Sequence, residues 1–133
     1  MNLVFMDTVG LLAVWDNTDQ WHLGASRALD EVISRGDRTI TSTFVLLECG
    51  NAASRRRYRH LVDQTRNTMA AGGKLIVPTE SDWDQAWSDY RSGNAGDAGI
   101  VDYVSFIIMR RLGITDAFTN DRHFKAAGFN TLF

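Results

Sequence analysis

Cysteine and proline are almost absent from this chain. Cys49 is the only cysteine among 133 residues, which excludes an intrachain disulfide and a zinc site built on several cysteines. Pro78 is the only proline, which argues against a β-sandwich rich in turns. The longest apolar runs fall far short of the roughly 20 residues that a membrane-spanning helix needs. These absences favour a soluble protein without covalent cross-links.

The chain also lacks an excess of positive charge. Fourteen Lys and Arg residues against sixteen Asp and Glu residues give a formal charge of −2, so nucleic-acid binding by bulk positive charge is excluded and any such contact needs a local patch. The length fits a single domain over 1–133, and the hydrophobic share of 44% is typical of globular proteins. The first residues carry no basic segment and soon reach Asp7, so we expect no signal peptide and a cytoplasmic location.

Short apolar runs alternate with longer segments of helical periodicity. Apolar or β-branched runs predict strands at 3–6, 38–42, 74–77, 117–120 and 129–133. Helical spacing predicts helices from Thr18 or Asp19 to Gly36, and at 45–53, 56–71, 79–90, 100–112 and 122–127. This alternation is typical of an α/β fold around a central parallel sheet of about five strands. In such folds the functional residues lie at the carboxyl ends of the strands.

Four acidic residues occur in apolar surroundings. Asp7 ends the first strand, Glu48 lies in a helix that is otherwise apolar, Asp102 lies early in the most hydrophobic helix, and Asp121 follows a later strand. Other acids stand among polar residues and are interpreted as solvated surface; these are Asp30, Glu31, Asp63, Asp82, Asp84 and Asp89. Burying a carboxylate without a partner costs several kcal/mol, so each of the four needs a proton, a partner or a metal.

Each of the four acids also has an ordinary structural explanation. Asp7 and Asp121 follow strands and suit the N-cap of the next helix, and Asp102 suits a cap of its own helix. Glu48 has Arg55 or Arg56 as a possible ion-pair partner. These explanations do not account for the set, because a parallel sheet would bring all four positions together at one edge. Clustered carboxylates without Cys suit Mg²⁺ or Mn²⁺, which indicates metal-dependent hydrolysis of a nucleic-acid backbone.

Three segments resemble the PIN domains of VapC toxins: FMDT at the start, TSTFVLLECGNA, and VDYVSFIIMRRLGITDAFTNDRHFKAAGF near the end. The resemblance covers essentially the whole chain. It implies a three-layer α/β/α sandwich and a metal-dependent endoribonuclease, the toxin of a toxin–antitoxin pair. The acidic pocket of the family corresponds here to Asp7, Glu48, Asp102 and Asp121. The resemblance further implies an Mg²⁺ or Mn²⁺ cofactor, an RNA substrate, a homodimer, and a VapB-like antitoxin whose tail covers the pocket.

Some neighbouring residues fit or depart from the family pattern. Thr8 and Thr119 are interpreted as hydroxyls that orient the acids. Gly99 stands three residues before the third acid, where family members often carry serine. Asp97 has three open interpretations: a helix cap, a ligand acting through water, or simple loop. Asp116 competes with Asp121 for the fourth place, and the TNDRHF frame favours Asp121.

Arg55, Arg56, Arg57 and Arg59 form, together with His60, the only dense basic patch. Two interpretations have equal weight: the patch binds RNA phosphates beside the acidic pocket, or it is a solvated helix face with ion pairs. Arg110 and Arg111 are better explained as partners of a helix C-terminus.

Histidines and aromatic residues carry weaker signals. His123 is more easily explained as a surface or packing residue than as a substrate contact, and His22 as a packing residue. Trp83, Trp87 and Tyr90 recur at helical spacing, which favours core packing, whereas Trp15 and Trp21 flank a polar turn and are expected to be partly exposed.

Two rival functions differ in class. One is a catalytically silent PIN-like module that binds RNA or protein. The presence of all four acids argues against it, because a degenerate module usually loses one. The other is an Mg²⁺-dependent phosphatase, which the lack of a D-x-D motif after the first strand disfavours.

Overall fold

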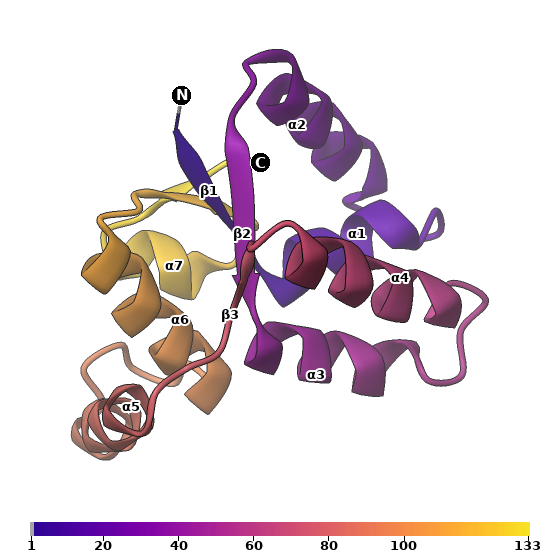
Figure 1. The fold of residues 1–133 in the computed structure, drawn as a ribbon. Coiled ribbons are helices and arrows are strands. Elements are labelled where there is room, and N and C mark those ends of the chain that lie inside the picture. The colour runs from indigo at the N-terminus through magenta and orange to yellow at the C-terminus, as the bar shows by residue number, and fades with distance from the viewer. Residues whose placement is uncertain (1) are drawn as a thin grey trace.

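The computed structural model describes residues 2–133 as alternating strands and helices (Figure 1). The strands are β1 (Leu3–Met6), β2 (Arg38–Ser42), β3 (Leu75–Ile76), β4 (Asp116–Phe118) and β5 (Asn130–Thr131). The helices are α1 (Thr8–Trp15), α2 (His22–Ser34), α3 (Thr43–Ala53), α4 (Arg59–Ala71), α5 (Glu80–Ser92), α6 (Ile100–Leu112) and α7 (Arg122–Ala126). The predicted elements are all present, with ends that differ by a few residues.

The five strands form one parallel sheet in the order β3-β2-β1-β4-β5. The chain starts in the centre at β1, builds outward to β3, and then crosses to the other side of β1 to add β4 and β5. The strand order therefore reverses between β1 and β4. In parallel α/β sheets the carboxyl ends of the strands at such a reversal border a crevice where ligands bind.

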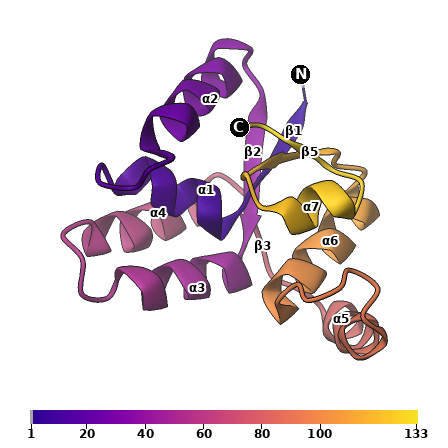
Figure 2. The ribbon, with the colours of Figure 1, turned by 180° about the vertical axis from the view of Figure 1, so that it is seen from behind.

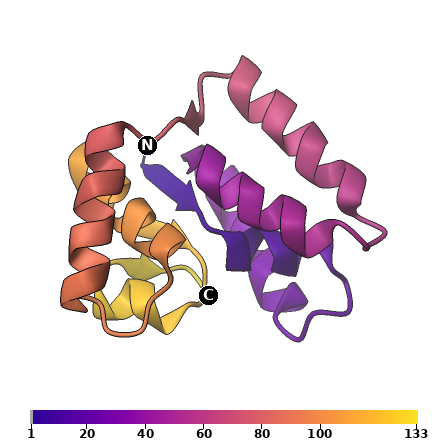
Figure 3. The same ribbon diagram turned by 90° about the horizontal axis from the view of Figure 1, so that it is seen from below.

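Helices cover both faces of the sheet. Figure 3 shows α3 and α4 on one side of the strands and α5, α6 and α7 on the other. α7 packs beside both α6 and β5 (Figure 2). The largest fully buried side chains include Phe5 and Phe118 from the sheet and Phe106 and Phe124 from the helices. The three-layer α/β/α architecture implied by the sequence resemblance is confirmed.

Helix α1 lies unusually close to strand β4. A Cβ atom added to Gly10 would stand 2.1 Å from the carbonyl oxygen of Phe118 and 2.5 Å from its ring. Only glycine permits this distance, because any side chain would overlap the strand backbone. The contact holds the start of α1 against the end of β4, where two of the predicted site residues lie.

Helix α5 corrects one expectation about acids. Asp82 was interpreted as solvated surface, but its side chain is buried. It accepts a hydrogen bond from the Thr79 backbone in a capping box at the start of α5, and it pairs with Arg111 of α6 at 2.8 Å. Arg111 therefore joins α6 to α5, in addition to its favourable place in the last turn of its own helix.

The aromatic residues of α5 correct another expectation. Helical spacing favoured core packing for Trp83, Trp87 and Tyr90, yet these side chains are 44%, 50% and 49% exposed. They lie beside other aromatic rings along the surface. The ring centroids of Trp83 and Phe44 are 5.1 Å apart, and those of Trp87 and Tyr90 are 5.5 Å apart. The expectation of core packing is therefore wrong for these three residues, and the buried residues of α5 are Asp82 and Ala86.

Two smaller expectations are confirmed. Trp21 is half exposed and Trp15 is partly exposed, as predicted for residues beside a polar turn. His22 packs at the start of α2, where a ring nitrogen lies 2.8 Å from the Ala13 carbonyl oxygen. No helix within residues 2–133 has the length and hydrophobicity to cross a membrane.

Candidate active site

Asp7 lies at the carboxyl end of the central strand, directly after β1, and is 1% exposed. One of its carboxylate oxygens accepts a hydrogen bond of 2.8 Å from the Thr119 hydroxyl, which follows β4. Asp7 occupies the N-cap position of α1, but its side chain makes no capping hydrogen bond. The capping explanation therefore fails for Asp7, whose carboxylate points elsewhere.

The other oxygen of Asp7, Oδ1, is buried and has no hydrogen-bond partner within residues 2–133. The pKa of this carboxyl is raised from 3.8 to about 7, mainly by burial and also by the nearby Asp102 and Asp121 carboxylates, whose effect exceeds that of the Thr119 hydrogen bond. A buried acceptor without a donor is costly in free energy. A cation at Oδ1 would remove this cost.

Asp102 is the third residue of α6, whose N-cap is Gly99, so Asp102 is not the cap of its helix. The pKa of Asp102 is raised to about 6, mainly by burial and also by the charges of Asp121 and Glu48. A Cβ atom on Gly99 would meet nothing within 4 Å, so the serine common in the family would fit at this position.

Asp121 does serve as a helix cap: its carboxylate accepts a hydrogen bond of 2.8 Å from the His123 backbone at the start of α7. The same residue lies beside Asp102, so capping and membership of the acidic cluster are compatible. Its own backbone N–H donates to the Thr119 hydroxyl at 3.1 Å. Asp116, the rival candidate, instead lies in β4 and accepts a hydrogen bond from Asn130.

Glu48 reaches the cluster from α3 and accepts a hydrogen bond of 2.6 Å from the Thr8 hydroxyl. Neither Arg55 nor Arg56 forms an ion pair with it among residues 2–133, so the ion-pair explanation is wrong for the described part of the chain. Thr8 follows Asp7 directly, which places the hydroxyl between the ends of β1 and α3.

His123 has a larger place in the site than the sequence suggested. Its Nδ1 lies 2.9 Å from Asp121 and its Nε2 lies 2.7 Å from Asp97, so the ring bridges two carboxylates. The hydrogen bond with Asp97 is the main cause that raises the pKa of His123. Potential ligand atoms of Asp102, Asp121 and His123 lie within 4.8 Å of one another. In the sequence, the only indication that His123 belongs to the site was its position two residues after Asp121.

The donor set tests whether a divalent cation fits. The charges of Asp102 and Asp121 raise the pKa of Asp7, and the charges of Asp121 and Glu48 raise the pKa of Asp102. Like charges this close are unfavourable without a proton or a cation. Oxygen ligands of this kind suit Mg²⁺ and Mn²⁺. The residues present therefore fit such an ion.

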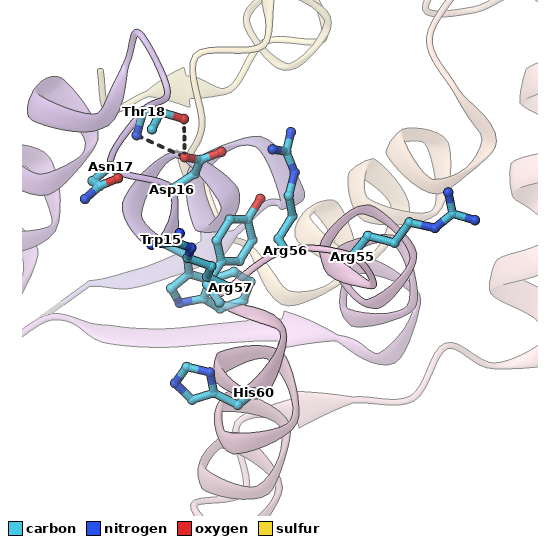
Figure 4. Close-up of a pocket in the computed structure, with 9 residues that line it drawn as sticks. Trp15, Asp16, Asn17, Thr18, Arg55, Arg56, Arg57 and His60 are labelled. Carbon is cyan, nitrogen blue, oxygen red and sulfur yellow. Dashed lines mark hydrogen bonds between the residues drawn. The ribbon is translucent and has the colours of Figure 1, made fainter.

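Most of the basic patch lines a separate pocket of about 560 Å³ (Figure 4). Arg55, Arg56 and Arg57 lie in the turn between α3 and α4, outside the helix predicted for 56–71. Tyr58 and His60 continue the same wall, and the end of α1 with the following loop forms the other. Arg59 lies elsewhere, in a groove between α3 and α4, and donates to the Ser54 carbonyl oxygen at 3.4 Å.

Comparisons with known proteins agree with this arrangement. No family model and no curated protein sequence matches the chain. Among solved structures, the chain matches the crystal structure of VapC20 from Mycobacterium tuberculosis with a TM-score of 0.78 and 26% identity, over 96% of each chain. The chain therefore has the PIN-domain fold of a VapC protein. VapC20 itself is described as a toxin that cleaves the sarcin-ricin loop. The resemblance seen in the three sequence segments is thus confirmed at the level of the whole fold.

Proposed function

We propose that this VapC-type chain is an endoribonuclease toxin that hydrolyses RNA phosphodiester bonds with Mg²⁺ or Mn²⁺ at the acidic cluster. The observation that carries the proposal is the buried Asp7 Oδ1, which has no hydrogen-bond partner within residues 2–133 and lies close to the Asp102 and Asp121 carboxylates. The whole-chain similarity to VapC20 of M. tuberculosis, a toxin that cleaves the sarcin-ricin loop, supports the same conclusion.

In this proposal Asp7, Glu48, Asp102 and Asp121 are the catalytic residues and hold the metal directly or through water. When bound, a divalent cation activates a water for in-line attack and stabilises the leaving oxygen of the phosphodiester. The Thr119 hydroxyl fixes the rotamer of Asp7 by its 2.8 Å hydrogen bond. Thr8 fixes Glu48 in the same way at 2.6 Å.

Asp97 and His123 extend the cluster toward solvent. Asp97 is mostly exposed and is held by His123 and, at 3.4 Å, by Arg122. We infer that the His123 ring orients Asp121, because Nδ1 contacts that carboxylate while Nε2 is anchored on Asp97. Asp97 would then act through His123 and not as a direct ligand. This role, that of an outer residue that positions a ligand, is none of the three interpretations that the sequence left open for Asp97.

RNA recognition is assigned to Arg55, Arg56, Arg57 and Arg59, which are exposed. Arginine suits phosphate because its planar guanidinium donates several hydrogen bonds and stays charged. The acidic cluster repels RNA without a cation, so basic residues outside it must supply the initial attraction.

The proposed partners are a cognate VapB-like antitoxin and a second copy of the chain. The exposed aromatic side of α5, formed by Trp83, Trp87 and Tyr90, supports a homodimer, because such residues are enriched in protein interfaces. We propose that the protein acts in the cytoplasm, where its RNA substrates are. Nothing within residues 2–133 favours the catalytically silent binding module, since all four acids are present.

The proposed function is tested by incubating end-labelled total RNA with purified protein free of antitoxin, in Mg²⁺, Mn²⁺ or EDTA. We expect discrete fragments with either metal, none in EDTA, and none from Asp7→Asn. Asp84→Asn is the matched control, because Asp84 is exposed on α5 and has no ion-pair partner within residues 2–133. Fragments that persist in EDTA or with Asp7→Asn would reveal a contaminating ribonuclease. Folded protein that cuts nothing with either metal would refute the proposal.

A further inference from the structure

The pocket at the end of α1 combines aromatic walls with positive charge. Trp15 and Tyr58 are partly buried, and their ring centroids lie 6.4 Å apart with an angle of 35° between the planes. The volume of about 560 Å³ falls within the range of about 300–1,000 Å³ typical of small-molecule sites. We call it the Trp15–Tyr58 pocket. Single-stranded RNA is commonly held by stacking of unpaired bases on such rings.

Three arginines border the Trp15–Tyr58 pocket without internal partners. Arg55, Arg56 and Arg57 are exposed, and none forms a salt bridge among residues 2–133. Figure 4 shows Arg56 extending on the side of Asp16, whereas Arg55 points away from the rings. Unpaired guanidinium groups at the rim of an aromatic pocket suit the phosphates on either side of a bound nucleotide.

The pocket also contains a carboxylate, which argues against a simple anion site. Asp16 accepts hydrogen bonds from the Thr18 hydroxyl at 2.6 Å and the Thr18 backbone at 2.9 Å, and both hold its pKa below the usual range. Asp16 is therefore ionised and held in place. An ionised carboxylate accepts hydrogen bonds but cannot donate them. It attracts the amino group of adenine, cytosine or guanine and repels the carbonyl that uracil carries instead.

We propose that the Trp15–Tyr58 pocket binds one unpaired nucleotide of the RNA substrate, with the base on the aromatic wall, its amino group at Asp16, and its phosphates at Arg56 and Arg57. This inference rests on the proposed ribonuclease function for the identity of the ligand. It adds a nucleotide subsite and a preference for an amino-bearing base.

The location of the pocket separates it from the site of cleavage. Helix α1 begins at Thr8, beside Asp7, and ends at Trp15. Eight residues of α-helix span about 12 Å. The Trp15–Tyr58 pocket therefore holds a nucleotide that is not itself cut, and it contributes to affinity and to the choice of RNA.

The experiment measures binding of fluorescein-labelled cytidine and uridine 12-mers, C12 and U12, to the full chain carrying Asp7→Asn, in EDTA, by fluorescence anisotropy. At each base, cytosine carries an amino group and an unprotonated N3 where uracil carries a carbonyl and an N3–H. Three variants are made in this background: Trp15→Ala, the double variant Arg56→Gln/Arg57→Gln, and Asp16→Asn. The matched control is Arg27→Gln/Arg38→Gln, which removes the same charge from two exposed arginines outside the pocket.

We expect C12 to bind more tightly than U12, and we expect Trp15→Ala and the pocket double variant each to weaken C12 binding by about tenfold. The control double variant should stay within about twofold of the parent. Asp16→Asn should bring the affinities for C12 and U12 close together. Because Trp15 packs partly against the core, the exposed arginine variants carry the test if Trp15→Ala is misfolded.

Three results would overturn the inference: C12 binding that is unchanged in the folded pocket variants, an equal loss in the control double variant, or no preference of the parent for C12. Binding of an acidic peptide that the pocket variants lose, without any loss of C12 binding, would assign the pocket to a protein partner instead. The readout is independent of catalysis. If the wild-type protein cleaves RNA but the pocket variants bind C12 normally, only the pocket inference is refuted. If the pocket variants lose C12 binding but the wild-type protein never cleaves RNA, only the proposed function is refuted.

Discussion

The hydroxyl of Thr119 donates a 2.8 Å hydrogen bond to the carboxylate of Asp7, although the two residues are 112 positions apart in the sequence. The bond joins the carboxyl ends of β1 and β4, which are neighbours in the sheet. The same hydroxyl accepts the backbone N–H of Asp121 at 3.1 Å. Thr119 thus sets the positions of two members of the acidic cluster at once.

Replacing Thr119 by valine should weaken metal binding and RNA cleavage by about 10- to 100-fold, because Asp7 loses the donor that orients it. Thr119→Ser retains the hydroxyl and should stay close to wild type. The measurements are Mn²⁺ affinity by calorimetry and cleavage rate at saturating Mn²⁺. Wild-type Mn²⁺ affinity in a folded Thr119→Val protein would show that Thr119 only fills space.

The metal-free protein should lose stability as the pH rises from 5 to 8. The folded state raises the pKa of Asp7 from 3.8 to about 7, so it holds this proton more tightly than the unfolded chain does. The resulting stabilisation is complete below about pH 4 and is lost as the pH rises through about 7. Between pH 5 and 8, Asp7 alone lowers the free energy of unfolding by an amount on the order of 2–3 kcal/mol. Asp102, with a pKa of about 6, acts in the same direction.

Thermal unfolding in EDTA at several pH values measures this loss. Asp7→Asn should flatten the pH dependence and raise the Tm at pH 8, because it removes a buried charge. Added Mn²⁺ should raise the Tm of wild type more at pH 8 than at pH 5, since the metal competes with protons for the carboxylates. Equal Mn²⁺ shifts in wild type and Asp7→Asn would contradict a role of Asp7 in metal binding.

Gly10→Ala should destabilise the fold by roughly 1–3 kcal/mol or more, because the added methyl group overlaps the Phe118 backbone. Gly24→Ala is the control: it lies in α2, a Cβ atom there meets nothing within 4 Å, and alanine should stabilise the helix by about 0.5–1 kcal/mol. Urea unfolding of both variants measures these changes in stability, which should have opposite signs. An unchanged midpoint for Gly10→Ala would mean that α1 moves away from β4 at little cost.

The purified protein should be a dimer whose interface includes the aromatic side of α5. Trp87→Lys places a charge in that surface and should shift the light-scattering mass from two chains toward one. Leu23→Lys, at a residue that is 70% exposed on α2, should leave the mass unchanged. A monomeric wild-type protein at micromolar concentration would contradict the proposed homodimer.

Local pattern was enough to identify most elements and to single out Asp7, Glu48, Asp102 and Asp121. A carboxylate in an apolar run is visible in sequence because its neighbours fix its burial. The same reasoning failed for Asp82, whose neighbours are polar. Its partner, Arg111, is 29 residues away, and only helix packing brings the two together.

His123 is a second residue whose role local sequence could predict only in part. Its contact with Asp121 follows from a spacing of two residues, but its contact with Asp97 depends on how the loop before α6 meets α7. The aromatic residues of α5 share one side of their helix, but the expectation that they pack in the core was wrong. Their exposure depends on how far that helix turns toward its neighbour, which periodicity does not determine.

The sequence by itself determined the parallel α/β class and singled out four acidic residues as candidates, because hydrophobic burial and the cost of an unpaired charge act on each segment locally. Only the tertiary structure decided the strand order that joins Asp7 to Thr119, the unpartnered oxygen of Asp7, and the pocket that Trp15 shares with Tyr58. These features arise from contacts between segments far apart in the chain. Their geometry is set by packing of the whole domain, which no single segment encodes.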